Sequence, residues 1–150
     1  MKYKNYDKFK DYETWNLDNT FARFIVPRLK RFRELVASPD TVYGYPVVVG
    51  SMELWLEILD KMIWAFEQYI DDYIDQYCSG EVDIKSEEAD TSDLTEEMLD
   101  DVDPERKGLY VVVDGPNDTF KMDHEGIKAH EAKMQEGIDL FAKYYQNLWT

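Results

Sequence analysis

Apolar side chains recur at helical spacing in three long stretches of the chain. They repeat every three to four residues over residues 18–36, 52–77 and 124–149, which places them on one side of each stretch. Pro27 lies inside the first stretch, where a proline removes one backbone donor and crowds the preceding turn, so we expect a kink or break at Val26. The pattern predicts three long amphipathic helices around an aromatic core.

The segments between these helices carry signals of β-structure. Residues 109–113 and 118–122 are short extended runs, and the turn-forming sequence Asp-Gly-Pro-Asn between them predicts a β-hairpin. Residues 41–50 are rich in β-branched side chains, but Pro46 leaves room only for an extended connection or for a short edge strand at residues 47–49. We therefore expect an α+β fold, predominantly helical, with a β-hairpin beside the three helices.

Length and composition favour a single folded domain. The chain has 150 residues, of which 44% are hydrophobic and 15% aromatic, and we expect residues 1–14 to form a polar N-terminal arm. Its one cysteine, Cys78, cannot form an internal disulfide and fits a reducing compartment. No stretch supplies the roughly 18 continuous apolar residues of a membrane span, and the N-terminus lacks the apolar core of a signal peptide. We expect a cytoplasmic protein that contacts no membrane.

Negative charge is concentrated in one segment. The formal net charge is −15, and residues 81–105 alone hold twelve acids and one base. A segment so acidic cannot form core, so we expect an acidic loop in which residues 92–99 have the composition of a short surface helix. Three interpretations stay open: a solvated loop, a mimic of the nucleic-acid phosphate backbone, or a different role such as divalent-cation binding. The acids that would bind a partner by mimicry are Glu87, Glu88, Asp90, Asp93, Glu96, Glu97, Asp100 and Asp101.

The motifs of the common catalytic and metal sites are missing from the sequence. Residues 101–112 begin like an EF-hand loop, but Arg106 stands in place of the turn glycine and Val112 in place of the bidentate glutamate. His124 and His130 are six residues apart, the wrong spacing for two ligands on one helix face, and we expect His130 to be a hydrogen-bonded residue at the edge of the core. No phosphate-binding, dinucleotide-binding or nucleophile-elbow motif occurs. We expect no enzyme, no metal site and no cofactor.

Basic side chains cluster on the first predicted helix. Four of them point away from the apolar side of this helix, and we call them the basic strip: Arg23, Lys30, Arg33 and, on the flank, Arg31. The strip is a solvated face, a docking face for the acidic loop of the same chain, or a contact for an anionic partner. Helical spacing directs Arg28 toward the apolar side, where it would hold a ligand's carboxylate or phosphate or an internal carboxylate, unless Pro27 shifts the register and carries it to the surface. All five side chains are candidates for anion binding.

Three stretches within the predicted helices carry a further pattern. They lie in residues 15–32, 58–66 and 136–149 and read WNLD followed by FIVPRLKRF, then ILDKMIWAF, then EGIDLFAKYY followed by LW. This third of the chain resembles a family of small bacteriophage proteins to which no activity is assigned. The resemblance implies a viral gene expressed inside a bacterium, and it carries over no catalytic or binding residue.

Together with the resemblance, the lack of catalytic motifs favours a protein that acts by binding. The leading hypothesis is a phage-encoded inhibitor of a host protein that handles nucleic acid or defends against phage, with the acids as decoy charge and no direct binding of nucleic acid. A second hypothesis is a binder that sequesters an anionic nucleotide through Arg28, nearby aromatic side chains and the basic strip. A third is a virion structural or assembly protein whose aromatic helices form an oligomer interface.

Overall fold

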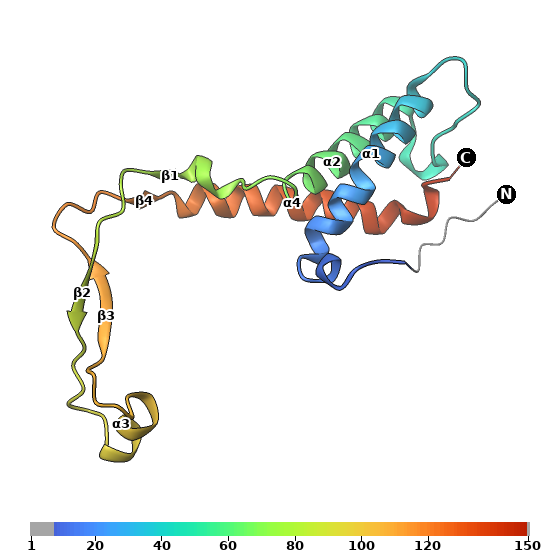
Figure 1. The fold of residues 1–150 in the computed structure, drawn as a ribbon. Coiled ribbons are helices and arrows are strands. Elements are labelled where there is room, and N and C mark those ends of the chain that lie inside the picture. Colours follow the sequence, from blue (N-terminus) through green and yellow to red (C-terminus); the bar gives the residue numbers. More distant parts are fainter. Residues whose placement is uncertain (1–7, 150) are drawn as a thin grey trace. The chain divides into compact units, whose positions relative to one another are not determined.

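The computed structural model describes residues 8–149 and confirms an α+β fold that is predominantly helical (Figure 1). The chain divides into two compact units. The helical unit comprises the residues up to Asp75 and those from His124 onward, and the acidic unit comprises Gln76–Asp123. The single-domain organisation stays a prediction of the sequence.

The helical unit is built on α1 (Leu17–Ala37), α2 (Met52–Glu67) and α4 (His124–Tyr144). Helix α2 packs against both α1 and α4 (Figure 1). Its start is fixed by Ser51, whose hydroxyl accepts a hydrogen bond from the backbone N–H of Leu54 at 3.2 Å. The buried core cluster consists of Ala22, Val26, Leu29, Val36, Trp55, Leu59, Met62, Ile63, Phe66 and Tyr144. The three predicted helices therefore exist and share the expected aromatic core.

Helix α1 runs through Pro27 without the break that the sequence predicted. Pro27 is exposed, so water can solvate the carbonyl of Arg23, which the proline leaves without its helical donor. Val26 and Leu29, on either side of the proline, are 6% and 3% exposed. Burial of these two neighbours holds the helix in one piece.

Helix α2 ends at Glu67, ten residues before the predicted end near Tyr77. A carboxylate of Asp72 accepts a hydrogen bond from the backbone N–H of Ile74 at 3.0 Å, a local turn that competes with the helix. The chain then forms the 3-10 helix η3 (Ile74–Tyr77). The predicted end was too late because the aromatic residues after Glu67 keep the helical spacing, although the backbone there is no longer part of the helix.

The connection from α1 to α2 is extended and holds no strand. It closes with the 3-10 helix η2 (Val47–Val49), in which the N–H of Val49 donates to the carbonyl of Pro46 at 2.8 Å. Gly50 follows with φ +91°, a conformation that favours glycine. Of the two alternatives that the sequence left open, the structure shows the extended connection, and the edge strand at residues 47–49 does not form. Two further 3-10 helices belong to the unit, η1 (Asp11–Thr14) and η4 (Tyr145–Asn147). Helix η1 lies within the predicted N-terminal arm, whose first seven residues are outside the described part of the chain.

The acidic unit contains two small antiparallel sheets and one short helix. Strand β1 (Cys78–Ser79) pairs with β4 (Lys121–Met122), and β2 (Ile84–Glu88) pairs with β3 (Tyr110–Asp114). Helix α3 (Glu96–Val102) lies in the connection between β2 and β3. The predicted hairpin of residues 109–113 with 118–122 was wrong, because these two runs pair with different partners.

Asp83 explains why the two predicted hairpin strands do not pair with each other. Its carboxylate accepts a hydrogen bond from the N–H of Asn117 at 2.9 Å, and its backbone N–H donates to the carboxylate of Asp118 at 3.0 Å. Its carbonyl accepts from Gly115 at 2.7 Å. The turn residues are thus bonded to Asp83, directly before β2. The sequence predicted β2 as part of the acidic loop because the strand, Ile-Lys-Ser-Glu-Glu, is polar.

Among the described residues, no helix combines the length and the apolarity that crossing a bilayer requires.

Helices α2 and α4 approach most closely at Gly137. A Cβ atom added there would lie 2.4 Å from the Cβ of Ala65 and 2.5 Å from the carbonyl oxygen of Lys61. We expect Gly137→Ala to lower the free energy of unfolding by about 1–2 kcal/mol, because the clash outweighs the roughly 1 kcal/mol by which alanine favours a helix. Chemical denaturation measures the change.

The control is Ala142→Gly at an exposed position of α4, which reports the helix propensity difference alone. An increase in stability on Gly137→Ala would show that the helices do not pack this closely.

Candidate functional site

The acidic unit carries most of the net negative charge of the protein. Residues 76–123 hold fifteen acids and four bases, a net charge of −11 out of −15. All eight acids predicted to bind a partner are exposed. Glu87 and Glu88 lie in β2, Asp90 and Asp93 in the following connection, and the other four in α3. The predicted acidic loop is therefore an ordered strand and helix, which present their carboxylates outward.

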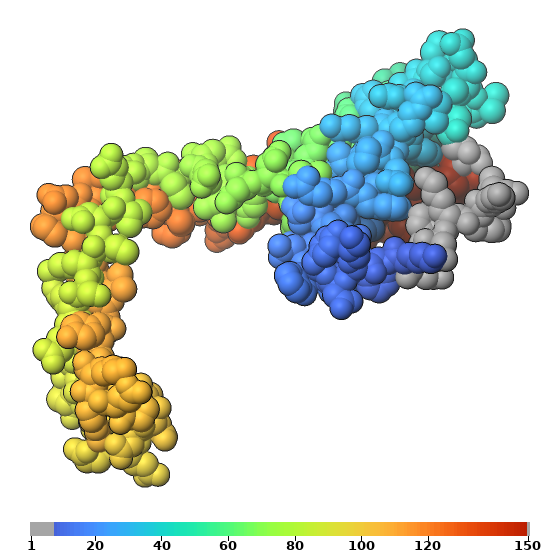
Figure 2. All heavy atoms as spheres, in the orientation of Figure 1, coloured from blue at the N-terminus to red at the C-terminus, as the bar shows by residue number. Residues whose placement is uncertain are grey.

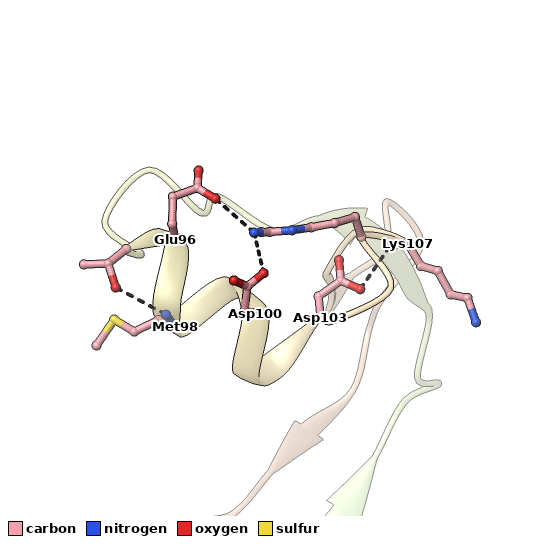
Figure 3. Close-up of polar contacts among 7 residues, drawn as sticks. Glu96, Met98, Asp100, Asp103 and Lys107 are labelled. Atoms are coloured by element: carbon pink, nitrogen blue, oxygen red, sulfur yellow. Dashed lines mark hydrogen bonds and ion pairs between the residues drawn. The ribbon is translucent and has the colours of Figure 1, made fainter.

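Local hydrogen bonds hold α3 in place although four of its seven residues are acids. Thr95 caps the helix, its hydroxyl accepting from the N–H of Met98 at 3.3 Å. Arg106 donates through Nη2 to Glu96 at 2.9 Å and to Asp100 at 2.7 Å (Figure 3). Because Glu96 and Asp100 are four residues apart on one helical face, a single guanidinium bridges both carboxylates. The guanidinium reduces the repulsion along this face.

The turn after α3 is organised by Asp103. One of its carboxylate oxygens accepts a hydrogen bond from the backbone N–H of Lys107 at 2.9 Å (Figure 3). The other accepts from the backbone N–H of Gly108 at 2.8 Å. Arg106 has φ +52° and Gly108 φ +92°, so the turn uses two left-handed positions. Within residues 8–149, no group of three or more metal-binding side chains is arranged to hold an ion. The carboxylate of Asp103 thus binds backbone N–H groups of this turn, in the segment whose sequence begins like an EF-hand loop.

The remaining acids differ in how far they are neutralised. Asp90 accepts a hydrogen bond from the N–H of Ser92 at 2.9 Å, and the backbone and hydroxyl of Ser92 lower the pKa of this carboxyl. Glu87 pairs with Lys85 at 2.5 Å. Four of the eight predicted acids form no ion pair within residues 8–149. They are Glu88, Asp93, Glu97 and Asp101. These four carboxylates are the ones free to meet a partner's cations.

The basic strip on α1 is largely occupied within the helical unit. Arg33 makes a two-point contact with Asp60 of α2, through Nε at 2.7 Å and Nη2 at 2.9 Å, and the hydrogen bond raises the pKa of Arg33 above its usual value. Lys30 pairs with Glu67, also on α2. Arg31 bonds within α1 to Glu34. Arg23 bonds to Asn19, one helical turn earlier, and to the carbonyl of Ile70, which follows α2. The strip thus joins α1 to α2 and its carboxylates.

Arg28 points to the surface, in contrast to the prediction that it faces the core. It donates to the carbonyl of Phe24, one helical turn earlier, at 2.6 Å. Its guanidinium lies 3.7 Å from the centre of the Phe24 ring, which is itself 40% exposed. The apolar face of α1 is narrower than the sequence pattern implied, since Ala22, Val26 and Leu29 define it. Arg28 is thus exposed, and it forms no ion pair with a carboxylate of residues 8–149.

A polar cluster formed by α4, the end of α2 and the segment that follows α2 was only partly anticipated. The expected core-edge role of His130 is confirmed: its ring is half-buried, and Nε2 lies 3.0 Å from the side-chain oxygen of Gln68. Tyr73 stacks on the imidazole with ring centres 4.5 Å apart, and Trp64 packs on it at 5.0 Å. The Tyr73 hydroxyl donates to Glu131 at 3.0 Å. These partners are distant in sequence, so no local pattern could have identified them.

Comparisons with known proteins give no match: no family model, no curated protein and no solved structure is similar to the chain.

We predict that Arg106→Gln loosens α3, because repulsion between Glu96 and Asp100 is then unopposed. The loss should be about 1 kcal/mol, the typical range for two exposed ion pairs. The ¹³Cα secondary shifts of residues 96–102 should fall toward random-coil values. Lys107→Gln, which makes the same charge change but removes only a contact to Glu105, should leave these shifts unchanged. Equal shifts in both variants would contradict the bridging role.

Tyr73 gives a prediction for alkaline pH. Burial and then the hydrogen bond to Glu131 raise its pKa above the usual 10. Because the folded-state pKa exceeds that of the unfolded chain, the stabilisation is fully present below about pH 10 and is lost as the pH rises through the folded-state pKa. Tyr73→Phe should remove this part of the decline in thermal stability. Tyr45→Phe, at a more exposed ring, should keep it.

Proposed function

We propose that this chain is a non-catalytic, phage-encoded binding protein that inhibits a host nucleic-acid-handling or anti-phage defence protein by occupying its cationic surface. The observation that carries the proposal is the ordered, exposed presentation of acids in a unit with net charge −11. Proteins that bind nucleic acid present lysines and arginines to phosphates. A folded surface of carboxylates competes for the same side chains.

Order matters for this competition. Carboxylates on a flexible loop lose conformational freedom when they bind, whereas carboxylates already placed by β2 and α3 lose less. The bridge from Arg106 and the caps from Thr95 and Asp103 keep the helix in place without covering the outward carboxylates of Glu97 and Asp101. This arrangement supports mimicry over a merely solvated loop.

Sequestration of an anionic nucleotide has less support. It needs Arg28 and the basic strip to converge on a ligand, but Arg28 lies over Phe24, and Lys30 and Arg33 are paired with carboxylates of α2. Assembly into a virion needs aromatic side chains of the helices for an interface, whereas Trp55, Phe66 and Tyr144 are buried within the helical unit. Inhibition through the acidic unit is therefore the function that we test.

The test neutralises the four acids that lack an ion partner: Glu88→Gln, Asp93→Asn, Glu97→Gln and Asp101→Asn together. Wild type should capture a nucleic-acid-binding protein from bacterial lysate at low salt, and DNA or RNA should displace the captured protein. The quadruple variant should capture at least about tenfold less, as expected when a charged interface is removed. Quantitative mass spectrometry and competition binding measure both effects.

A matched variant changes the net charge equally on the helical unit: Asp40→Asn, Glu53→Gln, Glu57→Gln and Asp71→Asn, all exposed. It should capture the same protein as wild type. If both quadruple variants lose capture equally, net charge and not the acidic surface is responsible. If neither loses capture, or if nucleic acid fails to compete, inhibition by mimicry is wrong.

A further inference from the structure

The β2–β3 ribbon is open along both of its edges. It is a sheet of two strands, and no third strand pairs with either one within residues 8–149. All residues of β2 and all but Val113 of β3 are exposed, so within the acidic unit no second layer covers either face of the ribbon. Figure 2 shows one of its sides. Unpaired strand edges carry backbone donors and acceptors that are suited to pairing with another chain.

The register identifies which backbone groups face outward. Ala89 donates to the carbonyl of Leu109 at 2.8 Å, and Gly115 donates to Asp83 at 2.7 Å, so these are hydrogen-bonded pairs of the ladder. Alternation in an antiparallel ladder then makes Ser86 and Val112 a non-hydrogen-bonded pair. Their N–H and C=O groups point away from the ribbon, Val112 at the edge of β3 and Ser86 at the edge of β2.

The two edges differ in chemistry. Strand β2 reads Ile-Lys-Ser-Glu-Glu, and charged side chains at an edge oppose the addition of a strand. Strand β3 reads Tyr-Val-Val-Val-Asp, with Tyr110 65% and Val112 67% exposed on one face of the ribbon. Aromatic and β-branched side chains favour cross-strand packing. The edge of β3 is thus better suited than the edge of β2 to pair with a further strand.

We propose that the open edge of β3 binds an extended, lysine- or arginine-rich segment of the partner protein as a third strand. The inference rests on the proposed function and adds how the partner is held: backbone hydrogen bonds from β3 position the segment, and the surrounding carboxylates select positive charge. A second copy of this chain would bring another unit of net charge −11 to the same edge, so charge opposes self-pairing and favours a cationic segment.

The probe is a fluorescein-labelled nine-residue peptide of alternating lysine and valine. Its control is the same peptide N-methylated at every residue, which keeps the charge but removes the backbone N–H donors from both edges, so that it cannot pair as a strand. Fluorescence anisotropy on the full chain measures binding at about 0.1 M salt, where charge is screened beyond roughly 10 Å. The parent peptide should bind at least about tenfold more tightly than the methylated one, the ratio expected when several hydrogen bonds are lost.

Two proline variants form a matched pair on the chain. Val112→Pro and Ser86→Pro each remove one outward N–H from opposite edges at paired positions, and each leaves the ladder bonds of its neighbours in place. Val112→Pro should weaken the parent peptide about tenfold or more, and Ser86→Pro should change its affinity less than about twofold. In wild type, the peptide should slow amide hydrogen exchange at Tyr110 and Val112, which tests the site even if a proline disturbs the ribbon.

Each contrary result overturns the inference. Equal affinity for the methylated peptide would show binding by charge alone, and equal effects of the two prolines, or exchange protection absent from Tyr110 and Val112, would exclude the β3 edge. Self-association of wild type that Val112→Pro abolishes would identify a second copy as the occupant. If Val112→Pro still captures the host protein while the quadruple acid variant does not, the strand addition fails and the proposed inhibition stands.

Discussion

The burial of α2 between two helices is the constraint on which the helical unit depends. Trp55, Leu59 and Met62 are at most 1% exposed, and they need partners on both sides of one helix. Close approach to α4 requires Gly137 opposite Ala65, since any side chain at residue 137 would meet the α2 backbone. Rings then fill the space edge to face, as Trp55 does against Tyr144 with ring centres 5.5 Å apart.

The acidic unit is stabilised in a different way, because none of residues 76–123 is buried. Two-stranded ribbons without a packed face are only marginally stable in water, and here the carboxylates also repel one another. Asp83 and Asp103 counter this by accepting backbone hydrogen bonds, and Arg106 by bridging Glu96 and Asp100. Some acids thus hold the unit together while others are available to a partner.

The sequence predicted those features that depend on local periodicity. The stripes of α1, α2 and α4 gave the helices and most of the core, and the run of acids gave the exposed charge. The sequence failed where a contact joins distant residues: Asp83 redirects the turn at residues 115–118, and the polar strand β2 had no apolar alternation to reveal it. For the same reason Arg106 was recognised only as a residue that spoils an EF-hand, although its role is to pair with acids six and ten positions earlier.

The charge of the acidic unit and its apolar strand edge are two parts of one arrangement. An exposed edge containing three consecutive valines would ordinarily lead to strand pairing between copies. Each copy carries the same excess of carboxylates near that edge, so approach of a second copy raises the electrostatic energy, whereas approach of a cationic strand lowers it. A partner strand would also supply the cross-strand packing that the two-stranded ribbon lacks. The same carboxylates that destabilise the isolated ribbon therefore determine which chain can complete it.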